Sequence, residues 1–315
     1  MPISPVELTL KLASGLLGFP VTPFTSELDF DEGKYRTLYR SMASAGAVAM
    51  FPAGGAGELF SLSPSEHRAV VRASVDETVG IPNVAGVGGS VKIAVEMARA
   101  TEAEGGDGIL ICPPYMVGGE QQGLADYVER ICRAVGIGVV IYNRDTLQLQ
   151  PDTVARLADR CPNLIGIKDG VGSIEGVLAL RAKLGDRIVL ANGLPTAEIA
   201  ALAYRALGVK TYSSAVYTFA PKLAMSFRSA FEAGDSETVD RLLTGFYLPL
   251  IEIRKRARGY AVSIVKAGLD AVGRSAGPLR PPLMSLTPTE RSTLTELLRV
   301  YAPFDILEHR ETASA

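Results

Sequence analysis

The sequence predicts an α/β fold, a (β/α)8 TIM barrel with a C-terminal helical appendage. Two observations lead to this fold class. Strand-then-helix units recur eight times between about residue 16 and residue 234, without an insertion long enough to be a domain. Beyond residue 235 the pattern is helical only. A doubly wound open sheet is the alternative, but five or six units would suit it better than eight. We therefore expect a barrel over residues 1–234 and a helical region over residues 235–315.

The eight expected strands are short apolar runs bounded by turn or polar residues, as strands buried on both faces are. The first of them contains two prolines and opens into a loop. The strands cover residues 16–24, 47–52, 83–87, 108–112, 136–142, 163–170, 187–191 and 209–213.

The expected helices alternate with these strands. The stretch Ser63-Pro-Ser-Glu66 is typical of a helix start, because Ser is the N-cap, Pro occupies the first position and Glu reaches back as a capping box. Thr287-Pro-Thr-Glu290 carries the same signal. The helical segments are 30–45, one beginning at 63, 91–104, 121–134, one beginning at 151, 173–184, one from 195 to 207, 237–253, 260–272 and one beginning at 287. The polar tail from residue 308 is expected to be frayed.

The composition argues against several classes of function. A hydrophobic content of 47% with 21% charged residues is ordinary for a globular enzyme with an ample core. The formal net charge is −2, and the one basic cluster, at residues 254–258, is short, so nucleic-acid binding has no support. No apolar run approaches the length of a membrane span, and the N-terminus lacks the layout of a signal peptide.

The cysteines and histidines point away from metal chemistry. Cys112, Cys132 and Cys161 are too few and too far apart for a disulfide framework or a zinc site, which fits a reduced, cytoplasmic setting. The two histidines, His67 and His309, lie in no metal-ligand pattern. We therefore expect no metal site and no histidine-based triad.

Polar and glycine residues follow most of the expected strands. Because the strands of a barrel deliver their carboxyl ends to one face, where active sites lie, these residues should converge on one pocket. They are the loop from Gly54 to Glu58, Tyr115, Tyr142, Asn143, Arg144, Lys168, Asn192, Gly193, Ser213 and Ser214.

Lys168 is the strongest candidate for the chemistry. It closes an apolar run that begins after Asn163, so its ammonium would lie close to an apolar interior. Desolvation there lowers the pKa of the amine and makes it a nucleophile toward a carbonyl. The alternative, a lysine that emerges into solvent at a strand end, is common.

The glycine loop after the second strand and a tyrosine beside the lysine strand suit such chemistry. The loop Gly54-Gly-Ala-Gly57 exposes consecutive backbone N–H groups that could hold a carboxylate or phosphate, or it is a tight turn that needs positive φ. The hydroxyl of Tyr142 could reach the lysine nitrogen and transfer protons, or it could be satisfied at the barrel rim.

Arg144 and Ser213 are candidates for substrate contacts. The guanidinium of Arg144 offers a fork for a carboxylate, or it pairs with Asp145 or Glu58. Ser213 could bond a hydroxylated substrate, or satisfy the backbone at a strand end.

The stretch Gly86-Val-Gly-Gly-Ser-Val91 is similar to the dinucleotide-binding fingerprint. However, Val91 replaces its third glycine, and Cys112-Pro-Pro114 stands where an acidic residue should follow the next strand. We therefore expect no NAD site.

Together, Gly-Gly-x-Gly-Glu after the second strand, Tyr142-Asn143 after the fifth and Gly-Ile-Lys168-Asp after the sixth resemble the dihydrodipicolinate synthase/N-acetylneuraminate lyase superfamily of class I aldolase-like barrels. Within it, further stretches are similar to the 5-dehydro-4-deoxyglucarate dehydratases. They are Tyr142-Asn-Arg-Asp145, Lys168-Asp-Gly-Val171, Asn192-Gly-Leu-Pro-Thr-Ala-Glu198, Tyr212-Ser-Ser-Ala-Val216 and Gly259-Tyr-Ala-Val-Ser-Ile-Val-Lys-Ala-Gly268. The resemblance runs from about residue 16 to residue 298, and the last three stretches are not general superfamily features.

The resemblance implies roles for individual residues. Lys168 would form a Schiff base with the substrate, Tyr142 would transfer protons, and Gly55 and Ala56 would form the carboxylate-binding loop. The reaction implied is conversion of 5-dehydro-4-deoxy-D-glucarate to 2,5-dioxopentanoate, water and carbon dioxide, with no metal or organic cofactor. The remaining substrate-binding candidates for this keto-deoxy sugar diacid are Arg144, Asn192, Gly193 and Ser213.

Two departures from the wider superfamily favour this dehydratase. Synthases and lyases carry hydroxyl residues where Gly55 and Ala56 stand, and synthases place a second tyrosine where Met116 stands. Both departures disfavour aldol condensation with pyruvate. The alternatives are a 2-keto acid aldolase or synthase of the same superfamily, and a non-enzymatic sugar-acid-binding barrel. The resemblance also implies a homo-oligomer, either a dimer or a tetramer.

Overall fold

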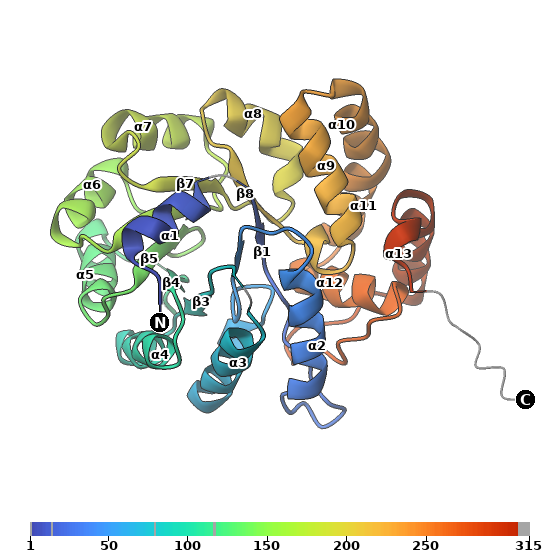
Figure 1. Ribbon diagram of the computed structural model, residues 1–315, viewed down its shortest axis with the longest axis horizontal. Coiled ribbons are helices and arrows are strands. Elements are labelled where there is room, and N and C mark those ends of the chain that lie inside the picture. The colour runs from blue at the N-terminus through green and yellow to red at the C-terminus, as the bar shows by residue number, and fades with distance from the viewer. Residues whose placement is uncertain (1, 14, 79, 116–117, 308–315) are drawn as a thin grey trace, which may run out of the picture.

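The computed structural model describes residues 2–13, 15–78, 80–115 and 118–307 of the chain. Eight parallel strands form the predicted barrel, with helices between them and around the outside (Figure 1). The strands are hydrogen-bonded in the order β2-β1-β8-β7-β6-β5-β4-β3. They are β1 (Leu16–Gly18), β2 (Ala49–Met50), β3 (Val84–Val87), β4 (Gly108–Ile111), β5 (Gly138–Asn143), β6 (Leu164–Asp169), β7 (Val189–Asn192) and β8 (Thr211–Ser214).

The barrel closes between β2 and β3 through bonds outside the regular ladder. The N–H of Met50 donates to Pro82 O at 2.9 Å, and the N–H of Gly86 donates to Pro52 O at 2.8 Å. Glycine is required at position 86, because a Cβ there would lie 2.2 Å from the carbonyl oxygen of Ala53. This glycine of the stretch that is similar to a dinucleotide fingerprint thus serves close strand packing.

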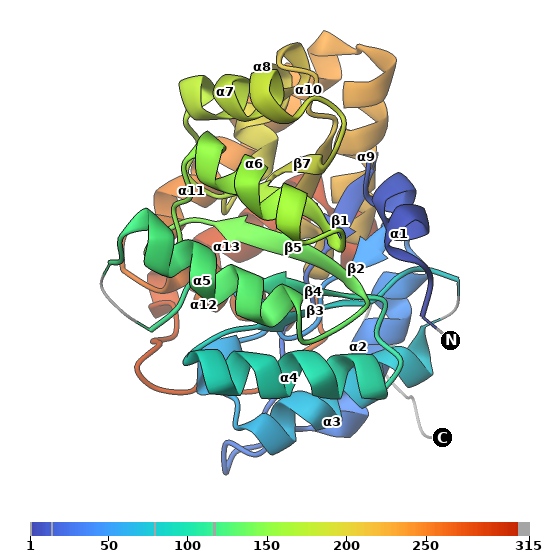
Figure 2. The ribbon, with the colours of Figure 1, turned by 90° about the vertical axis from the view of Figure 1, so that its left-hand side faces the viewer.

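Each strand is followed by a helix on the outer surface, and Figure 2 shows α4, α5 and α6 packed side by side there. The capping box of Ser63 and Glu66 starts α3 as predicted. The helices that follow β1 to β8 are α2 (Glu32–Ala43), α3 (Pro64–Glu77), α4 (Val91–Ala103), α5 (Gln121–Cys132), α6 (Pro151–Arg160), α7 (Ile174–Leu184), α8 (Ala201–Ala206) and α9 (Pro221–Ala233).

The C-terminal helices lie together against one side of the barrel (Figure 1). Their buried side chains belong to the same continuous hydrophobic core as those of the strands. The predicted capping box of Thr287 and Glu290 starts the last of them. These helices are α10 (Ser236–Leu242), α11 (Leu248–Arg254), α12 (Tyr260–Ala271) and α13 (Pro288–Tyr301).

Proline explains two differences from the expected elements. The first strand was expected over residues 16–24, but β1 ends at Gly18, because Pro20 and Pro23 have no N–H to donate to a ladder. The helix expected over residues 237–253 is interrupted by a π-helical turn, Leu243–Tyr247, directly before α11. Pro249 in the first turn of α11 cannot donate to the preceding turn, which favours such a bulge.

A helix that the sequence analysis did not predict, α1 (Pro5–Leu12), covers the amino-terminal ends of the strands. Ser4 caps it, and Leu8 and Leu12 are its buried residues. Leu8 packs so closely on β4 and β5 that a Cβ at Gly108 or Gly138 would lie 2.8 or 2.7 Å from its Cδ2 atom. The start signal Ser-Pro-x-Glu was present in the sequence, in a segment too short to show a helical period.

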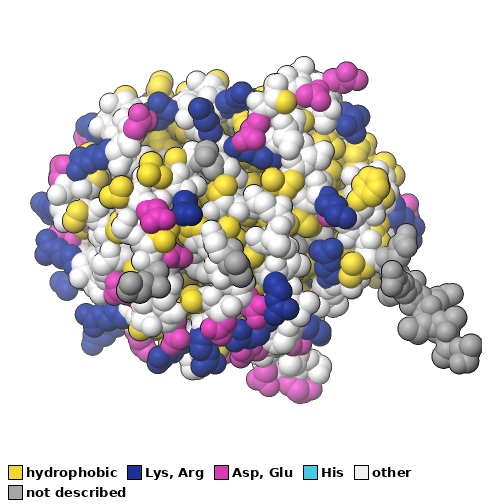
Figure 3. Space-filling view, in the orientation of Figure 1, with side chains coloured by type: hydrophobic (Ala, Val, Ile, Leu, Met, Phe, Trp, Pro, Cys, Tyr) yellow, Lys and Arg dark blue, Asp and Glu magenta, His cyan; other side chains and the backbone are white. Residues whose placement is uncertain are grey.

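The surface carries charges of both signs. Figure 3 shows Lys and Arg interspersed with Asp and Glu over the face of Figure 1. Within the described ranges, no helix is both long and apolar enough to cross a bilayer. The three cysteines are buried and form no disulfide.

The buried imidazole of His67 should make folding sensitive to acid. Its Nε2 donates to Gly86 O at 2.8 Å, and burial lowers the pKa of the ring to about 4. In the unfolded chain, His67 binds a proton near pH 6.5. The contribution of His67 to the free energy of unfolding should therefore be constant above that pH and fall as the pH drops toward 4. The loss attributable to this group should approach about 3 kcal/mol.

Urea unfolding at pH 7 and pH 4.5 measures this loss. A His67→Gln variant, which keeps a side-chain N–H donor, should lose less stability than the wild type between the two pH values. Equal losses in the two proteins would show that His67 is not the acid-sensitive group.

Candidate active site

The carboxyl ends of β5 and β6 place the two main candidates side by side. Tyr142 and Lys168 are partners in the register of these strands, and Lys168 pairs in turn with Ala191 on β7. A cavity of about 290 Å³ opens at this end of the barrel. The predicted residues that line it are Gly55, Ala56, Tyr142, Arg144, Lys168, Gly193, Ser213 and Ser214.

The Lys168 side chain is only 4% exposed, which rules out the alternative of a lysine emerging into solvent. Its Nζ donates to Gly193 O at 2.9 Å and lies 3.5 Å from the centre of the Tyr142 ring. Burial lowers the pKa of this amine, and the Arg144 charge acts in the same direction, whereas Tyr142 opposes them. The arrangement favours a neutral, nucleophilic amine.

The Tyr142 hydroxyl is held between a cation and a carbonyl. It accepts a hydrogen bond from Arg144 Nη1 at 2.9 Å and donates to Gly193 O at 3.1 Å. Burial alone would raise the pKa of this phenol, but the nearby positive charges of Lys168 and Arg144 together outweigh burial and lower it. The carbonyl of Gly193 therefore accepts hydrogen bonds from both the Lys168 amine and the Tyr142 hydroxyl. This hydroxyl ionises more easily than that of an ordinary tyrosine.

Arg144 is engaged on two sides. Its Nε pairs with Asp145 at 2.7 Å, as one of the structural alternatives predicted, while its Nη1 contacts Tyr142. The other predicted partner, Glu58, pairs instead with Lys266. Arg144 also lines a second cavity of about 310 Å³, which shares Gly55 and Tyr142 with the first. The guanidinium thus lies where the two cavities meet.

The glycine loop, residues 54–58, forms one wall of the first cavity. The structure records no intramolecular acceptor, within the described part of the chain, for the N–H groups of Gly55 and Ala56. The positive φ values fall on Ala53 (φ 49°) and Glu58 (φ 56°), and none of Gly54, Gly55 and Gly57 has a positive φ. The interpretation that these glycines serve a turn with positive φ is therefore wrong, and the carboxylate-binding interpretation stays a prediction.

Asn192 does not line the cavity. Its side-chain amide donates to Ala197 O at 2.8 Å, and its Oδ1 accepts from the N–H of Leu194 at 3.3 Å. These bonds hold the loop that places Gly193 beside Lys168. The Asn192 side chain is therefore engaged within the loop, and the substrate contact expected for it has no geometric support. Ser213 lines the cavity, with only a long bond of 3.5 Å from its hydroxyl to Asn192 O.

The sequence analysis missed part of the lining. Phe19 from the loop after β1 and the amino-terminal end of α12, with Gly259, Ala261 and Val262, complete the cavity. The stretch from Gly259 was noted only as a family feature, and nothing in its pattern shows that it reaches the barrel mouth. Tyr115 is 74% exposed beside the second cavity, and Met116 lies outside the described residues.

Residues 12–300 match the model of the dihydrodipicolinate synthetase family. The chain belongs to this family. A relative from Methylobacterium radiotolerans, 52% identical over 94% of this chain and 98% of its own length, is named a probable 5-dehydro-4-deoxyglucarate dehydratase. A relative from Rhizobium rhizogenes with the same name is 49% identical over 94% of this chain and 98% of its own length. The family resemblance predicted from the motifs is confirmed.

Solved structures of the family share the barrel. Dihydrodipicolinate synthase from Oceanobacillus iheyensis has a TM-score of 0.86 at 24% identity, covering 95% of this chain and 99% of that one. YagE from E. coli K12, solved in complex with pyruvate, has a TM-score of 0.82 at 25% identity, covering 92% of this chain and 99% of that one.

Gly193 should be intolerant of any side chain in this family member. A Cβ at this position would lie 2.4 Å from Lys168 Cγ and 2.9 Å from Nζ, so Gly193→Ala must displace the lysine. Displacement of a reacting group by about 1 Å can cost on the order of 100-fold in rate, and we expect a loss of at least that size.

Steady-state kinetics measures the loss in rate of Gly193→Ala, and circular dichroism checks that the variant is folded. Gly123→Ala is the matched control, because a Cβ on this helical glycine of α5 meets no atom within 4 Å. A folded Gly193→Ala enzyme with normal turnover would contradict the arrangement.

Proposed function

We propose that this family member is a Schiff-base-forming dehydratase and decarboxylase. It converts 5-dehydro-4-deoxy-D-glucarate to 2,5-dioxopentanoate, releasing water and carbon dioxide. The observation that carries the proposal is the buried amine of Lys168 beside the phenol of Tyr142 in an open cavity. The names of relatives that are about half identical over nearly the whole chain support the choice of substrate.

Imine formation is the first step. The neutral amine of Lys168 attacks the ketone carbon of the substrate, and the carbinolamine loses water to give a protonated imine. The lowered pKa of this lysine supplies the neutral amine nearer to neutral pH than an ordinary lysine would. The positive charge of the protonated imine, whose nitrogen comes from Lys168, is stabilised by the face of the Tyr142 ring.

Dehydration follows from the acidity that the iminium gives to the adjacent CH2. Tyr142, with its lowered pKa, is the base that removes a proton from this carbon, which gives an enamine. The enamine electrons then expel the hydroxyl group on the next carbon. A proton joins the departing hydroxyl to form water, and the product is an iminium conjugated with a carbon–carbon double bond.

Decarboxylation uses the same electron sink. The bond to the distal carboxylate breaks, and its electron pair moves through the new double bond to the nitrogen, which releases CO2 and leaves a dienamine with an enol. Protonation on carbon and hydrolysis of the imine then return the lysine and give the semialdehyde. The water lost in imine formation is taken up again in hydrolysis, so the net release is one water and one CO2.

Binding of the diacid uses backbone and side-chain groups that line the cavity. The N–H groups of Gly55 and Ala56 hold the carboxylate next to the ketone, as an anion nest does. Arg144 and Ser213 orient the distal end.

We also propose that the enzyme works in the cytoplasm as a homo-oligomer, a dimer or a tetramer. The setting is supported by three buried cysteines that remain free. The assembly is supported by the family to which the chain belongs.

Borohydride reduction in the presence of the keto-deoxy sugar diacid tests the proposed function. Peptide mass spectrometry should find the reduced adduct on Lys168, and Lys168→Ala should show neither adduct nor CO2 release. An adduct on another residue, or pyruvate as the product in place of CO2, would reject the proposal.

Replacing Tyr142 with Phe isolates the proton transfer. The ring that packs on Lys168 remains, but the hydroxyl is lost, so kcat should fall by about 100- to 10,000-fold, the usual contribution of general acid–base catalysis. Stopped-time borohydride trapping should still label Lys168. Unchanged kcat in Tyr142→Phe would remove the phenol from the mechanism.

A further inference from the structure

A buried ion pair outside the cavity joins two of its walls. We propose that Glu58 and Lys266 are positioning residues, which hold the glycine loop against α12 and so set the geometry of the carboxylate-binding wall. The inference rests on the proposed function, because it concerns how that site holds a carboxylate.

Glu58 is the last residue of the glycine loop. Its side chain is fully buried, and its Oε1 lies 2.7 Å from Lys266 Nζ. Its Oε2 accepts from the backbone N–H of Arg280 at 3.2 Å. The left-handed conformation of Glu58 is costly for a residue with a Cβ, and such conformations persist where surrounding contacts fix them. The carboxylate therefore anchors the loop three residues from Gly55, which lines the cavity.

Lys266 lies on α12, one turn after Val262, and its side chain is 3% exposed. Its Nζ donates to Pro278 O at 2.7 Å and lies 4.3 Å from the centre of the Phe24 ring. The amino-terminal end of the same helix lines the cavity, as Gly55 and Ala56 of the glycine loop do. One contact between Glu58 and Lys266 thus connects both walls. Lys266 itself does not line the cavity, so it does not compete with Lys168 for the ketone.

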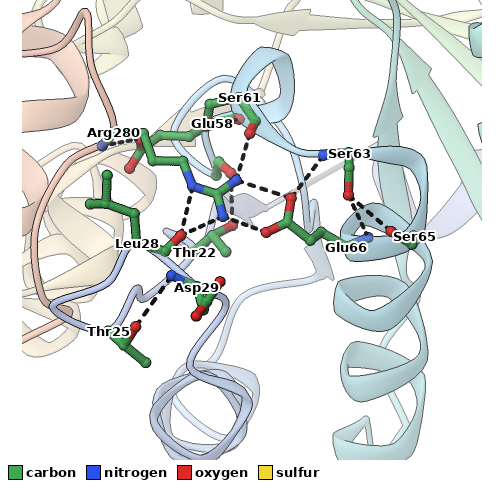
Figure 4. Close-up of polar contacts among 11 residues, drawn as sticks. Thr22, Thr25, Leu28, Asp29, Glu58, Ser61, Ser63, Ser65, Glu66 and Arg280 are labelled. Carbon is green, nitrogen blue, oxygen red and sulfur yellow. Dashed lines mark hydrogen bonds and ion pairs between the residues drawn. The ribbon is translucent and has the colours of Figure 1, made fainter.

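Arg280, whose backbone N–H bonds Glu58, also connects neighbouring segments through its side chain, and Figure 4 shows its contacts to Leu28, Ser61 and Glu66. The guanidinium lies between the loop after β1 and the start of α3: its Nε donates to Leu28 O at 3.0 Å, and its Nη1 bonds Glu66 at 3.0 Å and Ser61 O at 2.5 Å. It also lies 4.1 Å from the centre of the Phe24 ring, against which Lys266 packs too. The ion pair itself is kept from water, because the side chains of Glu58 and Lys266 are both buried.

Stability alone does not account for an ion pair at this place. Taking two charges out of water offsets much of their attraction, and apolar residues of similar size are often as stable or more stable. Unlike the ion pair, apolar side chains do not fix the direction and length of a contact between the loop and the helix. A carboxylate that must meet one ammonium and one backbone N–H holds the loop in a single position, which a pocket for a small anion requires.

The test separates carboxylate binding from imine formation. Pyruvate and its neutral methyl ester carry the same ketone, so the ratio of their borohydride-trapping rates at Lys168 measures how much the carboxylate contributes. The double variant Glu58→Gln/Lys266→Met leaves no unpaired buried charge, which favours folding, and Lys266→Met is measured beside it. We call the ratio of the pyruvate rate to the ester rate the pyruvate preference. We expect it to fall by about 10- to 100-fold in both variants, with the trapping rate of the ester unchanged.

Arg36→Met is the matched control. It removes a cation that contacts Glu32, Asp76 and Glu77 between α2 and α3, away from the cavity lining, so the preference should stay at the wild-type value. A folded double variant that keeps the wild-type preference overturns the proposal. Wild-type protein that shows no adduct on Lys168 with the keto-deoxy sugar diacid overturns the proposed function instead, and this inference with it.

Discussion

The chemistry proposed for this barrel depends on one amine, that of Lys168, which is buried away from water. Lys168 is surrounded by the Tyr142 ring, the Phe19 ring and the carbonyl of Gly193, none of which carries a full charge to stabilise an ammonium. Its positive charge is therefore costly, and the same charge, with that of Arg144, makes the phenol of Tyr142 easier to ionise. Burial thus favours the neutral amine that the proposed reaction needs, and the neighbouring cations favour the ionised phenol, whereas Tyr142 itself favours the charged form of Lys168.

The parts of the fold contribute to different tasks. Strands β5 and β6 fix the two groups of the proposed mechanism in a shared register, which leaves little freedom between Tyr142 and Lys168. Loops carry the groups proposed to meet the rest of the substrate, such as the glycine loop and Gly193. The C-terminal helices are more than a cover, since α12 forms part of the cavity and shares the barrel core.

Much of this arrangement could be predicted from the sequence, because apolar runs and the residues that end them place side chains at the mouth of a barrel. Lys168, Tyr142, Arg144 and the glycine loop were found in this way. Which atoms a side chain then contacts depends on segments that meet only in the folded chain. Asn192 shows this limit, since its amide turns to Ala197 and away from the cavity. The same holds for Glu58, whose partner lies in a helix far along the chain.

The helix α1 has a consequence for the site at the other end of the barrel. Leu12 of this helix and Lys168 border the same small internal void, together with Leu17 and Phe51. The first dozen residues therefore form a floor that keeps solvent from rising through the barrel interior. Deletion of this helix would open that void to solvent from the amino-terminal side without removing any residue that lines the cavity at the carboxyl ends of the strands.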